Sequence, residues 1–493
     1  MSEIKNKQLK ILTTLFLIPV FTMLFFSSAA IFRDAWFDES ITVLNFMLLP
    51  GPAKIYTSYV IPNNQIFFTI ILKYWIELYS WLAAPATYAF RLPSFLFGIG
   101  VLGIICFRWR KRLGTPAAMT AALTLSCSIP FIIYSTAIRG YMLSFLLLAL
   151  ILEAGYSFRK NSNWKAGLLY AVCSYLAVLT IPTNIIGIGA LVLFLLFEFH
   201  RKKLICLNSL YLAASPLIAL LLAYAPIWEK VAGVMKLREG WGNPWSVTTS
   251  VYLAVLYCLL PLVIIASFGL LSKRRRLIKD YLKTGSRILI LLMPLPFIFI
   301  KDPAPFPRVF FIFWVVWLYI FSVGAATAFA YMRKKIGLSG KKLYMFGAIL
   351  GGVIFSYGIL QQSTAQAVSG ALLKENQMDD YFSPYYMRST FKPSQTVKKI
   401  QQLSDGQPVP VYITFGADPW SIIFYGRARG MDTRLFGFDN PKFKIDQLRP
   451  GILAVLHNQS DIDYIRDKYK VNDLQLVMDN GYQRIYLITS VEE

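Results

Sequence analysis

The chain has 493 residues, of which 56% are hydrophobic and 15% are charged, and its mean hydropathy is +0.52. A soluble protein of this length needs more polar surface to cover its core, so the composition excludes a wholly soluble protein. The formal net charge of +24 lies largely in short clusters between apolar runs, a pattern that indicates membrane topology rather than a nucleic-acid surface. The clusters are 108–112, 159–160, 201–203, 273–276, and 333–335 with 341–342.

Apolar runs near the length that crosses a bilayer of about 30 Å recur from Ile11 to Leu360. We predict an α-helical polytopic membrane protein with about eleven spanning helices. The expected spans are 11–31, 90–107, 115–134, 140–157, 165–180, 183–199, 204–224, 249–271, 287–300, 308–332 and 343–361. The first run ends without a small-residue cleavage site, so we interpret it as a retained helix and not a signal peptide.

A further apolar run, Ile66 to Ala83, is predicted to lie in the interface or to re-enter the membrane without crossing it. If it crossed, every later basic cluster would fall outside, against the positive-inside rule. Lys73 and Glu77, four residues apart, suit one polar helix face near the headgroups. This topology places the N-terminus inside. It places outside the loop after the first span, several later loops and the C-terminal segment.

From Gln361 onward, short apolar stretches alternate with charged and turn-forming residues. We therefore predict a membrane domain over 1–361 and a small soluble α/β domain over 362–493 on the outer side. The expected strands are 409–415, 452–456, 475–478 and 484–488, and the expected helices are 395–403 and 461–469. This segment shows no Gly-rich phosphate loop, metal cluster or catalytic carboxylate pair, so we expect it to give structural support or to capture an acceptor.

The sharpest motif is Trp36-Phe37-Asp38-Glu39-Ser40, in a first outer loop that we place at about 32–65. Two adjacent carboxylates at the membrane surface are costly to hold close to lipid. A carboxylate there can act as a general base that takes a proton from an attacking hydroxyl or amine. The alternative is an ordinary solvated acid at a helix end, which the residue types alone favour.

Other residues on the predicted outer face favour a catalytic carboxylate over a solvated acid. Asn63, Asn64 and Gln65 carry amides that can bind sugar hydroxyls or phosphate oxygens, or can cap the following helix. Arginines at helix ends commonly extend to lipid headgroups, yet the positive-inside rule predicts few cations outside. The outer cations are Arg91, Arg139 (which precedes Tyr141), Lys301 and Arg308. An anionic lipid phosphate would explain them.

The order of these motifs resembles the polytopic glycosyltransferases of the GT-C fold. Phe37-Asp38-Glu39, Pro62-Asn63-Asn64-Gln65, Arg91-Leu92-Pro93-Ser94 and Ala137-Ile138-Arg139-Gly140-Tyr141 follow one another within about the first 200 residues. Within this group the chain is most similar to the protein O-mannosyltransferases and aminoarabinose transferases. Many bacterial relatives have a histidine where Gln65 stands, so either an amide suffices there or donor handling differs.

The resemblance implies an inverting transferase of the bacterial plasma membrane that uses a polyprenyl-phosphate monosaccharide as its donor. Asp38 would be the base, and Glu39 would support it or orient the acceptor. Arg139 and Arg308, with Arg91 and Lys301, would hold the leaving phosphate. Asn63, Asn64, Gln65 and Tyr141 would contribute to donor or acceptor binding. We expect no cofactor and no metal ion.

Two other functions stay open. A lipid or solute transporter would place ionisable residues inside its spans and show repeat symmetry, whereas here nearly all of them stand at span ends. A catalytically inactive relative could serve as a scaffold, which the intact pair Asp38-Glu39 argues against. The donor sugar is not readable from the sequence, and the acceptor could be a lipid A phosphate, a protein hydroxyl, a cell-wall polymer or another glycolipid.

Overall fold

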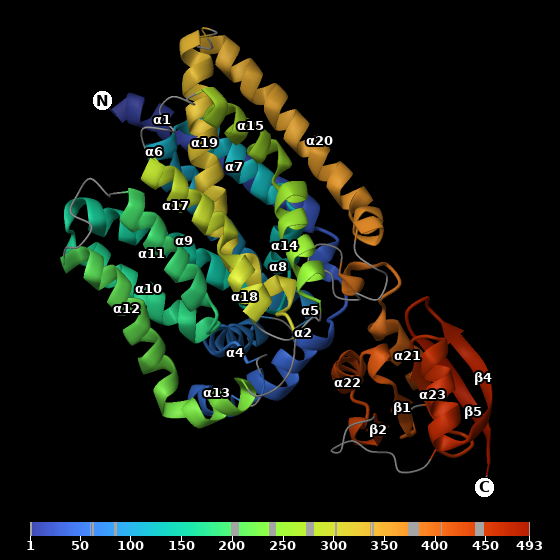
Figure 1. The fold of residues 1–493 in the computed structure, drawn as a ribbon. Coiled ribbons are helices and arrows are strands. Elements are labelled where there is room, and N and C mark those ends of the chain that lie inside the picture. Colours follow the sequence, from blue (N-terminus) through green and yellow to red (C-terminus); the bar gives the residue numbers. More distant parts are fainter. Residues whose placement is uncertain are drawn as a thin grey trace. The chain divides into compact units, whose positions relative to one another are not determined.

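The computed structural model divides the chain into two compact units (Figure 1). Unit 1 comprises Met1–Ile31 and Pro50–Ser383, and unit 2 comprises Phe32–Leu49 and Pro384–Glu493. The structure describes residues 2–59, 61, 64–82, 86–198, 207–235, 243–272, 281–300, 303–335, 337, 340–372, 384–405, 407–438 and 448–492. The basic clusters 201–203 and 273–276 lie outside these residues.

Unit 1 is helical throughout its described part. Its longer helices are α1 (Ser2–Ser27), α4 (Ile66–Ser80), α5 (Thr87–Gly103), α7 (Thr115–Cys127), α9 (Tyr141–Asn161), α10 (Trp164–Thr180), α11 (Asn184–Glu198), α12 (Leu207–Tyr224), α14 (Pro244–Cys258), α15 (Leu260–Ser272), α17 (Tyr281–Leu292), α19 (Trp314–Lys335) and α20 (Gly340–Leu372). Its shorter helices are α3 (Pro52–Thr57), the π-helix η3 (Ile104–Trp109), α6 (Arg110–Leu113), α8 (Ile129–Ser135), η4 (Ala225–Ile227), α13 (Trp228–Met235), α18 (Pro294–Ile300) and η5 (Pro307–Phe313). The 3₁₀ turn η1 (Ala30–Phe32) follows α1.

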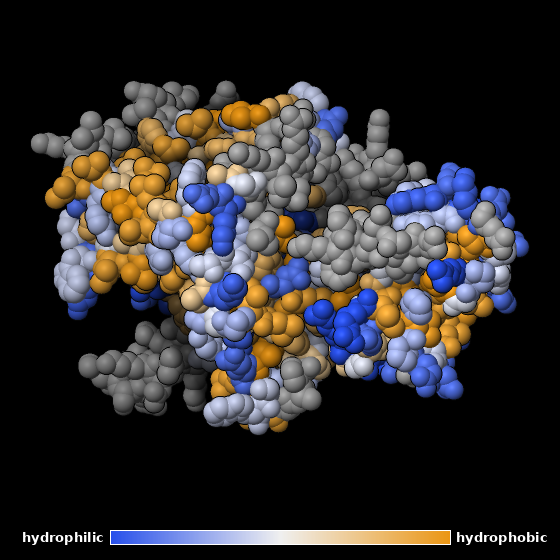
Figure 2. Space-filling model, turned by 90° about the horizontal axis from the view of Figure 1, so that it is seen from below, coloured by the Kyte–Doolittle hydropathy of each residue, from blue (hydrophilic) through white to orange (hydrophobic). Residues whose placement is uncertain are grey.

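Within the part of the chain that the structure describes, five helices are long and apolar enough to cross a membrane by length and composition, and the number is seven if each bent helix pair is one span. Four shorter apolar helices lie at Thr13–Ser27, Trp164–Thr180, Asn184–Glu198 and Thr284–Ile300. Large hydrophobic residues remain exposed on α12 and α20, and Figure 2 shows broad hydrophobic patches on one face. Such surfaces suit contact with lipid. Every predicted span overlaps one of these helices, although the total of eleven stays a prediction.

Two of the predicted spans are broken in the structure. α7 and α8 meet at an angle of 68°, and α14 and α15 at 81°. At the second break, α20 supplies hydrogen-bond donors to the backbone carbonyls of Tyr257 and Cys258. Tyr357 Oη donates to the Tyr257 carbonyl at 2.7 Å, and the Gln361 amide donates to the Cys258 carbonyl at 3.2 Å. Such substitute hydrogen bonds make a broken helix tolerable in a membrane.

Close packing holds the helices of unit 1 together. α9, α10, α11 and α12 pack against one another and lie side by side in green in Figure 1. α15 packs against α19 through Gly269 and Gly324. A Cβ on Gly269 would lie only 2.1 Å from the Gly324 carbonyl oxygen, so this approach needs glycine. Small residues serve this purpose at helix interfaces in membranes.

The run predicted not to cross the membrane forms α4 within the part of the chain that the structure describes. Lys73 and Glu77 form the expected i,i+4 ion pair at 3.3 Å, which confirms the predicted polar pairing on this helix. At 15 residues, α4 is about 22 Å long, less than the roughly 30 Å of a bilayer core. That it lies in the interface remains a prediction.

The described residues of unit 2 form a five-stranded sheet in the order β2-β1-β3-β5-β4. Its strands are β1 (Val411–Ile413), β2 (Phe436–Gly437), β3 (Leu453–Leu456), β4 (Val471–Asp479) and β5 (Arg484–Val491). β1 pairs in parallel with β2 and β3, and β5 pairs antiparallel with β3 and β4. Its longer helices are α21 (Pro393–Leu403), α22 (Pro419–Ala428) and α23 (Gln459–Tyr469). The prediction missed α22 and β2, whereas each predicted strand and helix overlaps an observed one.

The division of the chain differs from the predicted domains in two ways. α20 runs through the predicted boundary at 361/362, and the structural division lies between Ser383 and Pro384. More importantly, residues 32–49, which we predicted within the membrane domain, belong to unit 2. They form α2 (Phe37–Ile41) and the π-helix η2 (Thr42–Met47), and α2 packs against α22. The loop that carries the carboxylate pair is therefore part of the α/β unit.

Candidate active site

Asp38 and Glu39 lie in the first turn of α2, where the helix dipole favours negative charge. Both side chains are buried: Asp38 is 3% exposed and Glu39 is 0% exposed. A buried carboxylate must be compensated by charge or hydrogen bonds, because desolvating it alone is costly. The pair is therefore not the solvated loop acid that the residue types alone favour.

Arg33 compensates Glu39 through both carboxylate oxygens. The two guanidinium Nη atoms donate to Glu39 Oε2 at 2.9 Å and to Oε1 at 3.0 Å. Glu39 Oε2 also accepts from the Trp36 backbone N–H at 3.3 Å. Burial lowers the pKa of the Arg33 guanidinium, but the Glu39 carboxylate and two nearby tyrosines raise it above its usual value. The two charges thus form a bidentate buried pair, the strongest geometry that arginine offers a carboxylate.

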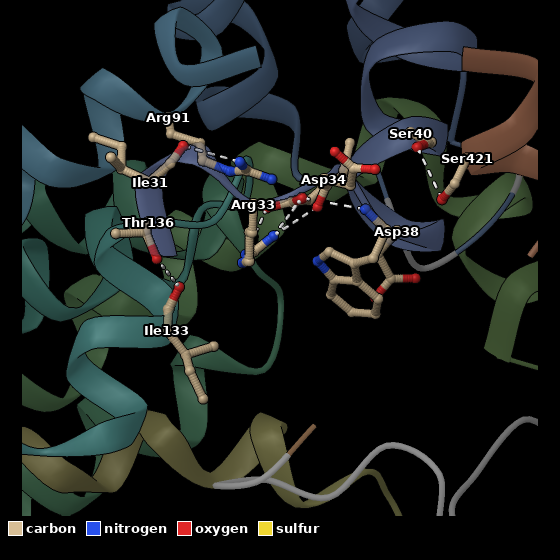
Figure 3. A network of polar contacts seen from close by, with 12 residues as sticks. Ile31, Arg33, Asp34, Asp38, Ser40, Arg91, Ile133, Thr136 and Ser421 are labelled. Carbon is tan, nitrogen blue, oxygen red and sulfur yellow. Dashed lines mark hydrogen bonds and ion pairs between the residues drawn. The ribbon is translucent and has the colours of Figure 1, made fainter. Parts of the chain in front are cut away.

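The C-terminal part of unit 2 holds this loop through further contacts. Asp34 accepts a hydrogen bond at 2.8 Å from the backbone N–H of Ser394, in the first turn of α21, where a helix N-terminus favours an anion. The Ala35 N–H donates to Tyr425 Oη at 2.8 Å. Ser40 Oγ lies 3.5 Å from Ser421 Oγ on α22, as Figure 3 shows. The carboxylate loop is therefore fixed by both α21 and α22.

In unit 1, the turn around Arg139 joins α8 to α9 and brings several predicted residues together. Arg139 is only 2% exposed, and its guanidinium carbon lies 5.7 Å from the centre of the Tyr141 ring. Gln65 Oε1 accepts a hydrogen bond from the backbone N–H of Gly140. Ser94 Oγ donates to the Arg139 carbonyl at 3.2 Å. The turn is thus held from α4 on one side and from α5 on the other.

Arg91 lies one turn before Ser94 on α5 and is 0% exposed. Its Nη1 donates to the Ile31 carbonyl at 3.0 Å (Figure 3). This contact satisfies a carbonyl just after α1. Arg91 and Arg139 therefore belong to adjoining segments, linked through Ser94.

Arg308 lies in η5 and is partly buried, with its guanidinium carbon 4.3 Å from the centre of the Phe306 ring. The same short helix reaches the Arg139 turn through aromatic rings. The Phe311 ring lies 4.8 Å from the Tyr134 ring, which in turn lies 4.7 Å from the Tyr141 ring. These ring contacts connect η5, which carries Arg308, with the segment that carries Arg139 and Tyr141.

The remaining predicted site residues have other surroundings. Asn64 donates from Nδ2 to the Ile55 carbonyl at 2.9 Å and to the Ser58 carbonyl at 3.3 Å, so it fixes the chain around α3. Asn63 and Lys301 lie outside the described residues. Among the described residues, no three His, Cys, Asp or Glu side chains are grouped so that they could hold a metal ion.

Gly140 gives a test of how tightly the Arg139 turn is packed. A Cβ at this position would lie 2.7 Å from Thr180 Cγ2 and 2.9 Å from Phe68 Cβ. We therefore expect Gly140→Ala to lower the free energy of unfolding by about 1–3 kcal/mol through overpacking. Thermal denaturation of the purified protein in detergent measures this. Gly352→Ala is the control, since nothing lies within 4 Å of its Cβ, and equal stability of the two variants would contradict the packing.

No family model and no curated protein matches this chain. Solved structures do match. ArnT from Cupriavidus metallidurans in the apo state has a TM-score of 0.53 and 12% identity, over 99% of this chain and 100% of that one. The same protein bound to undecaprenyl phosphate has a TM-score of 0.53 and 13% identity, over 98% of each chain. The Archaeoglobus fulgidus oligosaccharyltransferase in complex with zinc and sulfate has a TM-score of 0.43 and 10% identity, over 84% of this chain and 61% of that one.

The chain has the fold of these ArnT structures, which is GT-C-like. This confirms the fold resemblance that the order of the sequence motifs indicated. It also agrees with the apolar helices, so the chain is an integral membrane protein. The match extends over nearly the whole of both chains and therefore includes the GT-C-like body together with the α/β unit.

Sequence reasoning missed the residues that support the carboxylate loop of this GT-C-like fold. Arg33 stands six positions before Glu39. Neighbours on a helix face are three or four residues apart, and residues six apart on a strand are separated by about 20 Å, so neither regular structure predicts this contact. Tyr386 and Tyr425 lie some hundreds of residues away in sequence. One signal was available: Arg33 and Asp34 add two more charges at the end of an apolar run, where charge is costly to place.

Proposed function

We propose that this chain is an inverting glycosyltransferase that moves a monosaccharide from a polyprenyl-phosphate donor to an acceptor at the outer face of the membrane. One observation carries the proposal: both carboxylate oxygens of Glu39 accept hydrogen bonds from Arg33. An ion pair of this kind stabilises the charged carboxylate and leaves it poorly suited to take up a proton. Of the two adjacent buried acids, Asp38 is therefore the one to which we assign proton transfer.

The proposed reaction is a single displacement at the anomeric carbon. The acceptor hydroxyl or amine attacks that carbon while Asp38 takes its proton, and the bond to the donor phosphate oxygen breaks. Attack opposite the leaving phosphate inverts the configuration. Atoms and charge balance, since the proton goes to Asp38 and the electron pair of the broken bond goes to the phosphate.

Cations near the donor phosphate would offset the charge that develops on it. We assign this role to Arg91, Arg139 and Arg308, together with Lys301. The burial of Arg91 and Arg139 supports the assignment, because an arginine of low exposure interacts more strongly with a phosphate than a solvated one. The structure of ArnT with bound undecaprenyl phosphate supports a polyprenyl phosphate as the lipid part of the donor.

Four further residues complete the proposal. Gln65 supports the Arg139 turn through Gly140, and Tyr141 lies beside Arg139, so both act close to the proposed phosphate site. We assign Asn63 to donor or acceptor binding, and Asn64 supports the same connection before α4 through its hydrogen bonds to the Ile55 and Ser58 carbonyls. Transfer proceeds without a metal ion, so EDTA is expected to leave the rate of transfer unchanged.

Mass spectrometry of surface glycans tests the proposed function. Cells that carry the wild-type chain are compared with cells that carry Asp38→Asn at the same level in the membrane. We expect one glycan or glycolipid to lose the mass of a single sugar in the variant. Identical glycans in both strains, with a changed distribution of a lipid across the membrane, would instead favour the transporter.

A further inference from the structure

We propose that Arg33 is a positioning residue that, together with Tyr386, fixes the turn carrying Asp38. The inference rests on the proposed function, because it assigns Arg33 a role in that reaction. Arg33 lies at the start of the carboxylate loop, and Tyr386 lies in the short 3₁₀ helix η6 (Tyr385–Met387), directly before α21. Both belong to unit 2.

Three contacts tie Arg33 and Tyr386 to the residues around Asp38. Arg33 forms two hydrogen bonds to Glu39. Its guanidinium carbon lies 5.0 Å from the centre of the Tyr386 ring, within the range of a cation–π contact. The Tyr386 ring stacks on Trp36 with centroids 4.1 Å apart and planes inclined by 14°. The cluster of Arg33, Glu39, Tyr386 and Trp36 thus forms a closed set of contacts.

Asp38 lies between the two points of the backbone that this cluster fixes. Glu39 Oε2 accepts from the Trp36 N–H at 3.3 Å, and the Ser40 N–H donates to the Trp36 carbonyl at 2.9 Å. Trp36 is held by Tyr386, and Glu39 is held by Arg33. With the residues on both sides of it held, the backbone of Asp38 has little freedom to move.

Burial makes the cluster sensitive to the loss of one member. The side chains of Arg33 and Glu39 are 8% and 0% exposed. Removing Arg33 leaves Glu39 as a buried charge without its cation, and such a charge moves toward water or takes up a proton. Either response displaces the turn at Trp36–Glu39. A base displaced by even about 1 Å loses much of its catalytic effect.

Steady-state kinetics with the donor that the wild-type chain uses best separates positioning from binding. We expect Arg33→Ala to lower kcat about tenfold and to leave the KM for the donor within about twofold, because the donor phosphate is not bound by Arg33. Arg33→Lys keeps the charge but not the two parallel bonds, so it recovers part of the loss. A raised KM at unchanged kcat would overturn the proposal.

The surface pair of Arg434 and Asp432 supplies a matched control in the same unit. Arg434 Nε and Nη2 each donate to Asp432 at 2.8 Å, so the pair is also bidentate, but the Arg434 side chain is 89% exposed. Arg434→Ala is expected to leave kcat and KM within about twofold, since an exposed pair contributes little. A loss equal to that of Arg33→Ala would show that the effect is not specific to the loop.

A double-mutant cycle tests whether Arg33 acts through Glu39. If it does, the double variant Arg33→Ala with Glu39→Ala turns over no more than about twofold slower than the slower single variant. If the two losses multiply, Arg33 acts by another route and the proposal is wrong.

Hydrogen–deuterium exchange of the same variants tests positioning without reference to activity. We expect amides in the segment 36–42 to exchange at least about tenfold faster in Arg33→Ala and in Tyr386→Ala, and those of β3 to stay unchanged. Unchanged exchange in segment 36–42 would overturn the proposal whatever the kinetics show. If the wild-type chain transfers no sugar from any polyprenyl-phosphate donor, the proposed function fails, and the exchange result alone decides whether Arg33 holds the turn.

Discussion

Replacing Asp38 with Asn is expected to lower transfer turnover by at least about a thousandfold, because the amide cannot accept the proton that the acceptor loses as it attacks. General-base catalysis contributes roughly 10²–10⁴-fold in enzymes. The change is nearly isosteric in a side chain that is 3% exposed, so the local packing is preserved. Single-turnover transfer from a polyprenyl-phosphate sugar to membrane acceptors measures the loss.

Two controls separate the loss of the base from a general effect of the substitution and from a loss of donor binding. Asp467→Asn makes the same chemical change at an exposed position on α23 and is expected to leave turnover within about twofold. Binding of undecaprenyl phosphate to Asp38→Asn, followed by fluorescence titration in detergent, should match that of the wild-type chain within about twofold. Turnover of Asp38→Asn within tenfold of wild type would remove Asp38 from the role of base and leave Glu39 or another acid to be considered.

Hydropathy predicted the membrane part well because each span is a local property of the sequence. A run of apolar residues must cross or bury itself, whatever surrounds it, and each expected span overlaps a helix in the structure. The breaks after Cys127 and Cys258 were not predicted. Neither break depends on composition alone. At the second, the carbonyls of Tyr257 and Cys258 accept hydrogen bonds from Tyr357 and Gln361, about 100 residues further along the chain.

The α/β unit contains a helix, α22, that the sequence pattern also did not predict. Asp418 caps the N-terminus of α22 with a side chain that accepts from the Ser421 N–H at 3.1 Å, and Pro419 is the first residue of the helix. These are recognisable start signals. The helix still escaped prediction because most of its residues, from Pro419 to Gly426, are buried. A helix buried on nearly all sides has no polar face and shows no helical period.

The residues of the candidate site were chosen from the sequence by their chemistry, and the contacts between them were not predicted. The carboxylate pair and the cations of the predicted outer face stood out because such charges are unexpected in those positions of the sequence. The contacts that organise them could not be inferred, since they join residues as distant as Asp34 and Ser394. We assigned the predicted first outer loop to the membrane domain because of its position in the chain, whereas the hydrogen bonds of residues 34–40 go to α21 and α22. The C-terminal part of the α/β unit therefore holds the loop that carries Asp38.

Arg139→Gln is expected to weaken the binding of undecaprenyl phosphate by roughly 10–100-fold. A charge-assisted hydrogen bond contributes about 1.5–3 kcal/mol, and each 1.4 kcal/mol is about a tenfold change in affinity. Arg139 is 2% exposed, and its turn is fixed by Gln65 through Gly140 and by Ser94, so the backbone that carries the guanidinium is held in place. Titration of the purified variant with undecaprenyl phosphate in detergent gives the change in Kd.

The opposite end of α9 provides the control for Arg139. Arg159 is 4% exposed and lies in the last turn of this 21-residue helix, about 30 Å from its start. Arg159→Gln removes an equally buried cation from the same helix, and we expect the Kd for undecaprenyl phosphate to stay within about twofold. If both variants lose affinity equally, the loss reflects the net charge or stability of the helix, and Arg139 does not bind the phosphate. A loss confined to Arg139→Gln instead locates the phosphate at the N-terminal end of α9, which is the end where Tyr141 and Gln65 lie.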